Sequence, residues 1–394
     1  MSLPPSEIPL GAIRFNSDSQ KLEYWMCSAW MQIHTFSPNY DGGVRGFFIG
    51  GYNAEDRIDF ITISTQGNAT DFGNLTKGRA ETSALSNRTR GLVAGDAVPG
   101  SDDTIDVFTM STTGNATDFG NLTKARAEGV GLSNATRALA AGDAVPGSDD
   151  TIDVWVMSST GNAVDFGNLL SSTNNAQGFG ALANATRGIW GGGYQQSPVG
   201  QINVLQYVTI NSNGNAVDFG DLEGNSGQFS GTTGGSSPTR GLWFGGGPSP
   251  GTTGNTKIQY VTIASTGNGQ DFGEKIDIKG AATTASNSVR IVYFHGQSNL
   301  NSIEFVTTAT LGNAVDFGDM TLDSHYGATS NSSATRGCLA GGWNPTGPQA
   351  YQVHEVIEYV EIMSQGNAVD FGDLSTARYL MVRGCVSTGH GGLG

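Results

Sequence analysis

The sequence has 394 residues, of which 59 are glycine and only 14% are charged, and its formal net charge is −15. This acidic balance argues against a nucleic-acid partner, because contacts with phosphate need clustered lysine and arginine. No apolar run approaches the length that spans a bilayer, so we expect no membrane insertion. The first residues also lack the charged and apolar regions of a signal peptide.

The three cysteines, Cys27, Cys338 and Cys385, form neither a metal-binding spacing nor a disulfide framework. A free cysteine in a strand behaves as a small buried hydrophobe. We therefore expect synthesis in a reducing cytoplasm.

Residues 1–36 do not share the repeat that fills the rest of the chain, and they predict a small β module. The segment from Leu10 to Ile33 predicts three short strands, with turns at residues 16–19 and 27–29. Such a small sheet buries too little surface alone, so we expect it to dock on the rest of the chain or on another protein. The residues expected to dock are Arg14, Phe15, Tyr24, Trp25 and Trp30.

Residues 37–394 contain seven copies of Gly-Asn-x-x-Asp-Phe-Gly, spaced 45 to 54 residues apart. Repeats of this period are typical of solenoids and propellers. A catalytic set of residues occurs once in a chain, so a sevenfold motif indicates architecture. The repeated pairs are Asp71-Phe72, Asp118-Phe119, Asp165-Phe166, Asp218-Phe219, Asp271-Phe272, Asp316-Phe317 and Asp370-Phe371.

Each repeat predicts four short strands, which we call A to D. In the repeat from Thr123 to Leu169 they fall at residues 127–133, 137–142, 151–157 and 163–169. Four strands in about 50 residues is the composition of one propeller blade.

The order of landmarks in each repeat resembles the kelch repeat. Strand B ends in Gly-Gly in four units, at Gly50-Gly51, Gly191-Gly192, Gly245-Gly246 and Gly341-Gly342. An aromatic residue stands in strand C at Phe60, Phe108, Trp155, Tyr207, Tyr260 and Phe305. The sequence departs from kelch where Phe replaces a tryptophan in strand D, and at Gly95-Asp96 and Gly142-Asp143. The resemblance implies an all-β, kelch-like fold.

Seven copies of strand D predict a seven-bladed β-propeller with four-stranded blades. The first unit begins at strand B, Val44–Gly51, with no strand A before it. The chain ends at residues 383–392, which align with the strand A region at residues 83–91. We therefore expect the C-terminal strand A to join the N-terminal strands B to D and close the ring, which removes an exposed sheet edge.

The Asp-Phe-Gly motif also occurs in kinases, where it holds magnesium. Seven copies without a phosphate-binding loop exclude that interpretation. We expect Phe to pack between adjacent sheets and Asp to accept backbone N–H groups at a turn.

One arginine opens each strand B. Pairing with the Asp-Phe-Gly aspartates is the favoured interpretation, and an anion-binding mouth is the alternative, although converging arginines would repel one another. The seven are Arg45, Arg90, Arg137, Arg187, Arg240, Arg290 and Arg336.

Two neighbouring units share an acidic loop, with Asp96, Asp102 and Asp103 in one and Asp143, Asp149 and Asp150 in the other. Clustered carboxylates suit calcium. The favoured interpretation is ordinary turn chemistry in a duplicated unit, because the spacing is not that of an EF-hand.

Long loops between strands B and C vary while the framework stays constant. Recognition is commonly carried by such loops, and Tyr194, Trp343 and Tyr351 are candidates for stacking on sugars. Tolerated insertions are the alternative interpretation. The five histidines show no repeated spacing and no nucleophile motif occurs, so we expect no enzyme activity, no cofactor and no metal.

Residues 11–30 resemble a short module of structural proteins in tailed bacteriophages, Gly-x-Ile-Arg-Phe-Asn-x-Asp followed by Leu-Glu-aromatic and Trp. Together with the Gly-Asn-Ala-x-Asp-Phe-Gly propeller, it is similar to virion proteins of marine phages, notably those that infect cyanobacteria. The resemblance implies a non-enzymatic tail fibre, collar or head-surface protein, located in the virion and made in the host cytoplasm.

The partners that this resemblance implies are other virion proteins, docked through the N-terminal module, and a host-surface glycan. Many copies, or a homo-oligomer, are expected on the particle. The alternatives are a kelch-like carbohydrate-active enzyme with its site in the central mouth, and a spacer that binds no host ligand.

Overall fold

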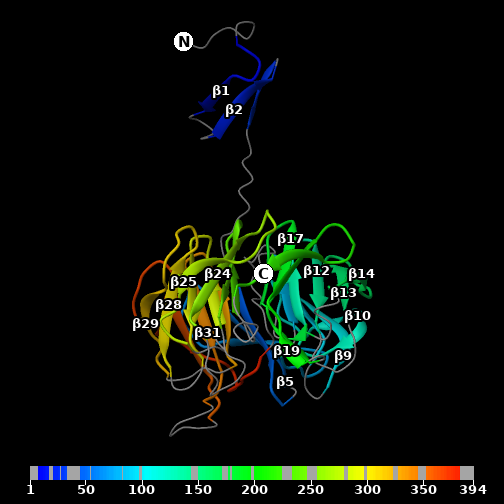
Figure 1. Ribbon diagram of the computed structural model, residues 1–394, viewed down its shortest axis with the longest axis vertical. Helices are drawn as coiled ribbons and strands as arrows, with labels where there is room; N and C mark the ends of the chain where they lie inside the picture. The colour runs from blue at the N-terminus through cyan, green and yellow to red at the C-terminus, as the bar shows by residue number, and fades with distance from the viewer. Residues whose placement is uncertain are drawn as a thin grey trace. The chain divides into compact units, whose positions relative to one another are not determined.

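The protein is described here by a computed structural model, in which all regular elements are β-strands and no helix occurs among the described residues (Figure 1). The chain divides into two compact units, residues 1–39 and residues 40–394. The description covers residues 8–16, 21–26, 28–32, 45–53, 55–81, 83–96, 100–142, 150–170, 176–177, 180–196, 199–223, 233–245, 255–278, 283–296, 300–322, 327–344 and 352–381.

The first unit contains one antiparallel sheet of three strands in the order β1-β2-β3. Two hairpins connect the three strands, which lie where the sequence predicts them. The strands are β1 (Ile13–Asn16), β2 (Lys21–Met26) and β3 (Ala29–Gln32).

The second unit contains seven sheets that each carry one copy of Asp-Phe-Gly, and we number them 1 to 7 along the chain. Among the described residues, sheet 1 has three strands and sheets 2 to 7 have four, so four antiparallel strands per repeat are confirmed in those six. Sheet 1 consists of β4 (Arg45–Gly51), β5 (Glu55–Thr62) and β6 (Thr70–Asn74). Sheet 2 consists of β7 (Ser83–Ser86), β8 (Arg90–Ala94), β9 (Asp102–Thr109) and β10 (Thr117–Arg126). Sheet 3 consists of β11 (Val130–Ser133), β12 (Arg137–Ala141), β13 (Thr151–Val156) and β14 (Val164–Asn168).

The later sheets repeat the same order, in which each strand pairs with the next strand of its repeat. Sheet 4 consists of β16 (Gly180–Ala183), β17 (Arg187–Gly191), β20 (Val204–Thr209) and β21 (Val217–Asp221). Sheet 5 consists of β22 (Thr233–Ser236), β23 (Arg240–Phe244), β24 (Lys257–Thr262) and β25 (Gln270–Glu274). Sheet 6 consists of β26 (Thr283–Ser286), β27 (Arg290–Phe294), β28 (Ser302–Thr307) and β29 (Val315–Asp319). Sheet 7 consists of β30 (Thr329–Ser332), β31 (Arg336–Ala340), β32 (Val356–Glu361) and β33 (Val369–Asp373).

A further small sheet lies within the fourth repeat, and two of its three strands fall in a segment, residues 193–201, that the sequence predicts to be a variable loop. It pairs β15 with β18 and β18 with β19. These strands are β15 (Ala176–Gln177), β18 (Tyr194–Gln196) and β19 (Val199–Gln201).

The burial of each strand follows from its place in the sheet. The second strands, such as β4, are apolar runs buried along nearly their whole length, as expected for strands covered on both faces. The fourth strands lie at the sheet edge and bury the phenylalanine of Asp-Phe-Gly, while the residues before it are exposed. Burial is therefore nearly complete in the second strand, inside the sheet, and is confined to the phenylalanine side of the fourth strand at the edge.

The register of the third strand corrects two aromatic positions. Phe60 pairs with Phe47 in sheet 1, and the equivalent register position holds Val107 in sheet 2 and Val154 in sheet 3. Phe108 and Trp155 stand one residue later, on the opposite face, and both are buried. A shift of one residue moves a side chain to the other face of a strand, so counting aromatics without the register was misleading here.

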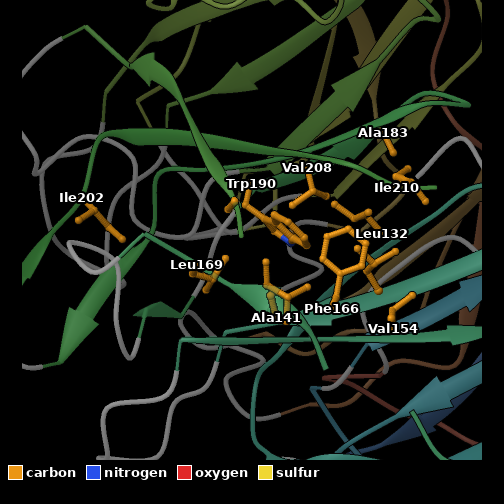
Figure 2. Close-up of a cluster of buried hydrophobic side chains, with 13 residues drawn as sticks. Leu132, Ala141, Val154, Phe166, Leu169, Ala183, Trp190, Ile202, Val208 and Ile210 are labelled. Carbon is orange, nitrogen blue, oxygen red and sulfur yellow. The ribbon is translucent and has the colours of Figure 1, made fainter. Parts of the chain in front are cut away.

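Apolar side chains of adjacent sheets form common clusters. Figure 2 shows one of these, where Trp190 of β17 lies beside Phe166 of β14 and Val208 of β20. Trp190 has no exposed surface, and truncating so large a buried side chain typically costs about 3–5 kcal/mol. Because each cluster draws on two sheets, neighbouring sheets are stabilised together.

One polar contact recurs between each of sheets 1 to 6 and the sheet that follows it, and also between sheet 7 and sheet 1. The backbone N–H five residues after an Asp-Phe-Gly aspartate donates to a buried polar side chain in the third strand of the next sheet, and we call this the linker hydrogen bond. Its donor and acceptor residues are Thr76 and Asp106, Thr123 and Asp153, Leu170 and Gln206, Glu223 and Gln259, Ile276 and Glu304, Thr321 and Glu358, and Ser375 and Asp59.

The acceptors are at most 1% exposed, so each hydrogen bond satisfies a polar group that would otherwise be costly to bury. In three sheets an arginine adds a buried ion pair to the same carboxylate, with Arg79 on Asp106, Arg126 on Asp153 and Arg378 on Asp59. The last pair joins residues 319 apart in the chain.

A second recurring contact brings backbones together at the Asp-Phe-Gly glycine. Gly120 has φ +145°, and a Cβ there would lie 2.5 Å from the carbonyl atoms of Gly161 in the next sheet. Gly161 has a similar φ of +152° but no atom within 4 Å of its own Cβ position.

We therefore expect Gly120→Ala to lower the free energy of unfolding by about 1–3 kcal/mol more than Gly161→Ala. Both variants strain the backbone, but only the first forces two sheets apart. Chemical denaturation of the two proteins measures the difference. Equal losses would show that backbone strain alone makes glycine necessary.

Candidate functional site

The seven arginines that open strand B contact the next sheet. In each case Nη1 donates to a backbone carbonyl, as Arg187 does to Ile263 O at 3.0 Å. The acceptors, in chain order, are Met110, Met157, Ile210, Ile263, Thr308, Ile362 and Ile63.

The guanidinium groups also stack on the aromatic side chain of strand C in five sheets. Arg187 lies 4.5 Å from the centroid of the Tyr207 ring, and Arg336 lies at the same distance from that of Tyr359. Such cation–π contacts are worth about 0.5–1 kcal/mol near a surface. The common role of these arginines is thus to join two sheets.

The predicted ion pair between each arginine and an Asp-Phe-Gly aspartate is therefore wrong as the shared interaction. The reason is that the aspartate side chain accepts a hydrogen bond from a backbone N–H within its own turn. Asp218 Oδ1 accepts the N–H of Gly220 at 3.1 Å, and the same contact occurs at Asp71, Asp118, Asp316 and Asp370. The phenylalanines that follow are all buried, at 2–3% exposure.

The feature best suited to bind a ligand is a run of three aromatic side chains, Tyr52, Tyr379 and Trp343, which we call the aromatic row. The ring centroids of Tyr52 and Tyr379 are 5.0 Å apart, and those of Tyr379 and Trp343 are 5.4 Å apart. The interplanar angles are 36° and 40°, so the rings are tilted from parallel. Tyr52 is 42% exposed and the other two are half-buried.

The row draws on the first and last sheets and on the segment that follows the last one. Tyr52 follows β4 of sheet 1, Trp343 follows β31 of sheet 7, and Tyr379 follows β33. Backbone hydrogen bonds fix this arrangement, because Tyr52 N donates to Tyr379 O and Gly342 N donates to Arg378 O. Burial and the nearby charges of Tyr52 and Glu81 raise the pKa of Tyr379.

Of the three loop residues predicted to bind, only Trp343 is described with its side chain. The structure describes the backbone of Tyr194 in β18, and Tyr351 lies outside the described residues. Sequence reasoning missed Tyr52 and Tyr379. A signal for Tyr52 was present, since it stands seven residues after the strand B arginine, as Tyr194 and Trp343 do.

In the first unit, the predicted docking residues lie on both faces of the sheet. Arg14, Trp25 and Trp30 share one face, where the Arg14 guanidinium lies 4.2 Å from the Trp30 ring and also pairs with Glu23. Hydrogen bonds from Asn16 and Arg14 lower the pKa of Glu23.

The opposite face carries Phe15 and Tyr24 among exposed apolar side chains, and it includes Ile13, Leu22 and Met31. This face is the more apolar of the two. Exposed apolar surface of this kind commonly marks a contact with another surface.

The first strands of sheets 2 to 7 contact one another in series. Their sequences are Ser-Ala-Leu-Ser, Val-Gly-Leu-Ser, Gly-Ala-Leu-Ala, Thr-Gly-Gly-Ser, Thr-Thr-Ala-Ser and Thr-Ser-Asn-Ser. None of these six strands contains a histidine, a tyrosine or a carboxylate. They are joined by hydroxyl contacts such as Ser83 Oγ to Gly129 O, at 2.6 Å.

A polar cluster lies between sheets 5 and 6, and two of its members, Lys275 and His295, stand where the other repeats have apolar residues or glycine. Lys275 stands at the position of Leu222 in sheet 4, and His295 stands at that of Gly245 in sheet 5. His295 Nε2 contacts Glu304 Oε1 at 2.5 Å, and Lys275 Nζ lies 3.5 Å from the Tyr293 hydroxyl. All four side chains are at most 4% exposed, so they are closed to a substrate.

The acidic loops differ in how much of them is described. In sheet 2, Asp96 accepts the N–H of Ala80, Asp102 pairs with Lys77, and Asp103 accepts from Asn121. Asp143 and Asp149 lie outside the described residues. Within the described parts of the chain, no group of three or more His, Cys, Asp or Glu residues is placed to hold a metal ion.

No family model matches this chain, and no curated protein matches it. In the part of the chain that the structure describes, no helix has the length and apolar character needed to cross a membrane.

The contacts of Arg187 and Asp218 make the two side chains independent. We expect Arg187→Ala and Asp218→Ala each to cost about 1 kcal/mol of stability, since each removes one hydrogen bond. Their effects should add to within about 0.5 kcal/mol in the double variant. Denaturant titration of the wild type, the two single variants and the double variant measures the coupling energy. A coupling energy well above that value would support an ion pair between the two side chains.

Burial lowers the pKa of Lys275 to about 8, although Glu304 and Asp277 oppose the shift. The unfolded chain therefore binds this proton up to a higher pH than the folded chain, and stability should rise as the pH passes from 8 to 10. At pH 7 we expect Lys275→Leu to stabilise the protein by about 1–3 kcal/mol, a gain that shrinks towards pH 10. The melting temperature as a function of pH measures this.

Met320→Leu is the matched control, because Met320 stands at the position of Lys275 in the next repeat. It should change the melting temperature little at any pH. A lower stability of Lys275→Leu across the whole range would show that the attraction between Lys275 and Glu304 outweighs the cost of burial.

Proposed function

We propose that residues 37–394 form a closed, seven-bladed, kelch-like β-propeller that serves as a non-enzymatic structural protein of a tailed-phage virion. The N-terminal module docks the protein to other virion proteins. The propeller displays its loops to neighbouring subunits or to a host-surface glycan.

The observation that carries the closed ring is that sheet 7 contacts sheet 1 as every other sheet contacts the next. Ser375 N donates to Asp59, and Arg336 Nη1 donates to Ile63 O. Gly67 N donates to Phe371 O, as Gly114 N does to Phe72 O between sheets 1 and 2. Sheet 7 and the segment after it thus make the same three types of contact with sheet 1 that the other sheets make with their neighbours.

The sequence supports the same closure at the missing strand of sheet 1. Arg79 and Arg126 each stand four residues before the first strand of the sheet whose carboxylate they bind. Arg378 binds the carboxylate of Asp59 in sheet 1, so an equivalent strand would begin at Val382. In this proposal the C-terminal residues supply strand A.

The role in the virion is supported by the resemblance of residues 11–30 and of the repeats to phage structural proteins. The apolar face of the first unit suits docking, and the first strands of sheets 2 to 7 contain no histidine, tyrosine or carboxylate. Copy number on a particle multiplies weak contacts, so each single contact need not be tight.

Imaging of purified particles labelled with an antibody against this chain tests the proposal directly. We expect label at the tail, collar or head surface. Absence of the protein from purified particles would exclude a virion role.

Two deletions separate ring closure from docking. Removing residues 382–394 should lower the melting temperature by several degrees, because sheet 1 would lose its proposed fourth strand. Removing residues 1–39 should leave that temperature nearly unchanged and should prevent incorporation into particles. Unchanged stability after the C-terminal deletion would contradict the proposed closure.

A further inference from the structure

We propose that the aromatic row of Tyr52, Tyr379 and Trp343 is a binding site for neutral sugars, with a pyranose ring packed on the row as its ligand. The inference rests on the proposed display of loops to a glycan and names the site and the class of ligand. It also makes the site depend on the junction between the last sheet and the first.

The row exists only where sheet 7 meets sheet 1. Tyr379 occupies the position held by Ala80 and Ala127 in two other linkers, and both of these alanines are buried. The flanking rings come from different sheets, since Tyr52 belongs to the first and Trp343 to the last. A chain whose ends do not meet would therefore lack the site.

The row is held in place before any ligand arrives. Arg378, next to Tyr379, is buried and pairs with Asp59, while its Nη1 donates to Gly50 O and Arg57 O. On the other side, Trp343 itself forms an antiparallel β-bridge with Val353. A surface that is already ordered binds with a smaller entropy cost.

The shape and charge of the row favour an uncharged sugar. The C–H face of a pyranose ring is weakly positive and is attracted to the negative face of an aromatic ring. The ring centroids are about 5 Å apart and the rings are tilted by 36° and 40°, so neighbouring rings stack on each other and do not form the box of perpendicular walls that encloses an ammonium group. Glu81 lies near Tyr379, and the chain carries a net charge of −15, so anionic sugars would be repelled.

Saturation-transfer NMR and calorimetry on the full chain test the site, with maltotriose, cellotriose and mannotriose as neutral probes. We expect at least one of them to bind, and sialyllactose to bind more weakly. Tyr379→Ala should weaken binding by about tenfold or more, since one stacking surface is lost. Tyr52→Ala should act in the same direction.

Both variants should fold, because Ala80 and Ala97 stand at the equivalent positions of other repeats. The matched control is Tyr260→Val, which removes an aromatic ring outside the row. Valine should be tolerated there, because Val107 and Val154 occupy the equivalent position in sheets 2 and 3. This substitution should leave binding unchanged.

Three results would overturn the inference: no binding of any neutral probe, unchanged affinity in Tyr379→Ala, or a preference for tetramethylammonium or sialyllactose. None of these would remove the protein from the particle, so the labelled images still decide the virion role separately.

Discussion

The architecture depends on one constraint, which is that each third strand buries a polar side chain that accepts a hydrogen bond from the linker that follows the neighbouring sheet. Asp106 has no exposed surface, yet it receives the backbone N–H and the hydroxyl of Thr76. Apolar clusters attract neighbouring sheets without fixing their register, whereas this hydrogen bond sets which linker residue meets which strand. The cost of leaving the acceptor unpaired gives the contact its specificity.

The buried acceptor of this hydrogen bond is a different type of side chain in different sheets of the second unit. Sheets 1 to 3 use aspartate with an arginine, and sheets 4 and 5 use glutamine beside a buried tryptophan, Trp190 or Trp243. Sheets 6 and 7 use glutamate. The three aspartates thus accept the linker N–H and also pair with an arginine.

Much of the architecture could be predicted from the sequence, because periodicity reports strands directly. The four strands from Thr123 to Leu169 and the three strands before the repeats lie where the pattern places them. Phe108 and Trp155 lie in the third strands as predicted, but their offset by one position was not foreseen, because register depends on pairing, which spacing does not reveal. The arginine contacts were missed since their partners are backbone carbonyls, which leave no trace in side-chain composition.

The candidate site shows the same limit. Trp343 could be recognised in the sequence as an aromatic residue of a variable loop. Tyr379 could not, because it meets the other rings only where the segment after β33 contacts a sheet that is distant in sequence. No reading of neighbouring residues brings together positions 52, 343 and 379.

The contact between Ser375 and Asp59 spans 316 residues, and this has a consequence during synthesis. At ribosomal speeds of 5–20 residues per second, the carboxylate of Asp59 waits about 16–63 s for its partner to be translated. Until then the nascent first sheet carries an unsatisfied charge and cannot complete its packing. Folding of the second unit therefore cannot be completed before Ser375 has been synthesised.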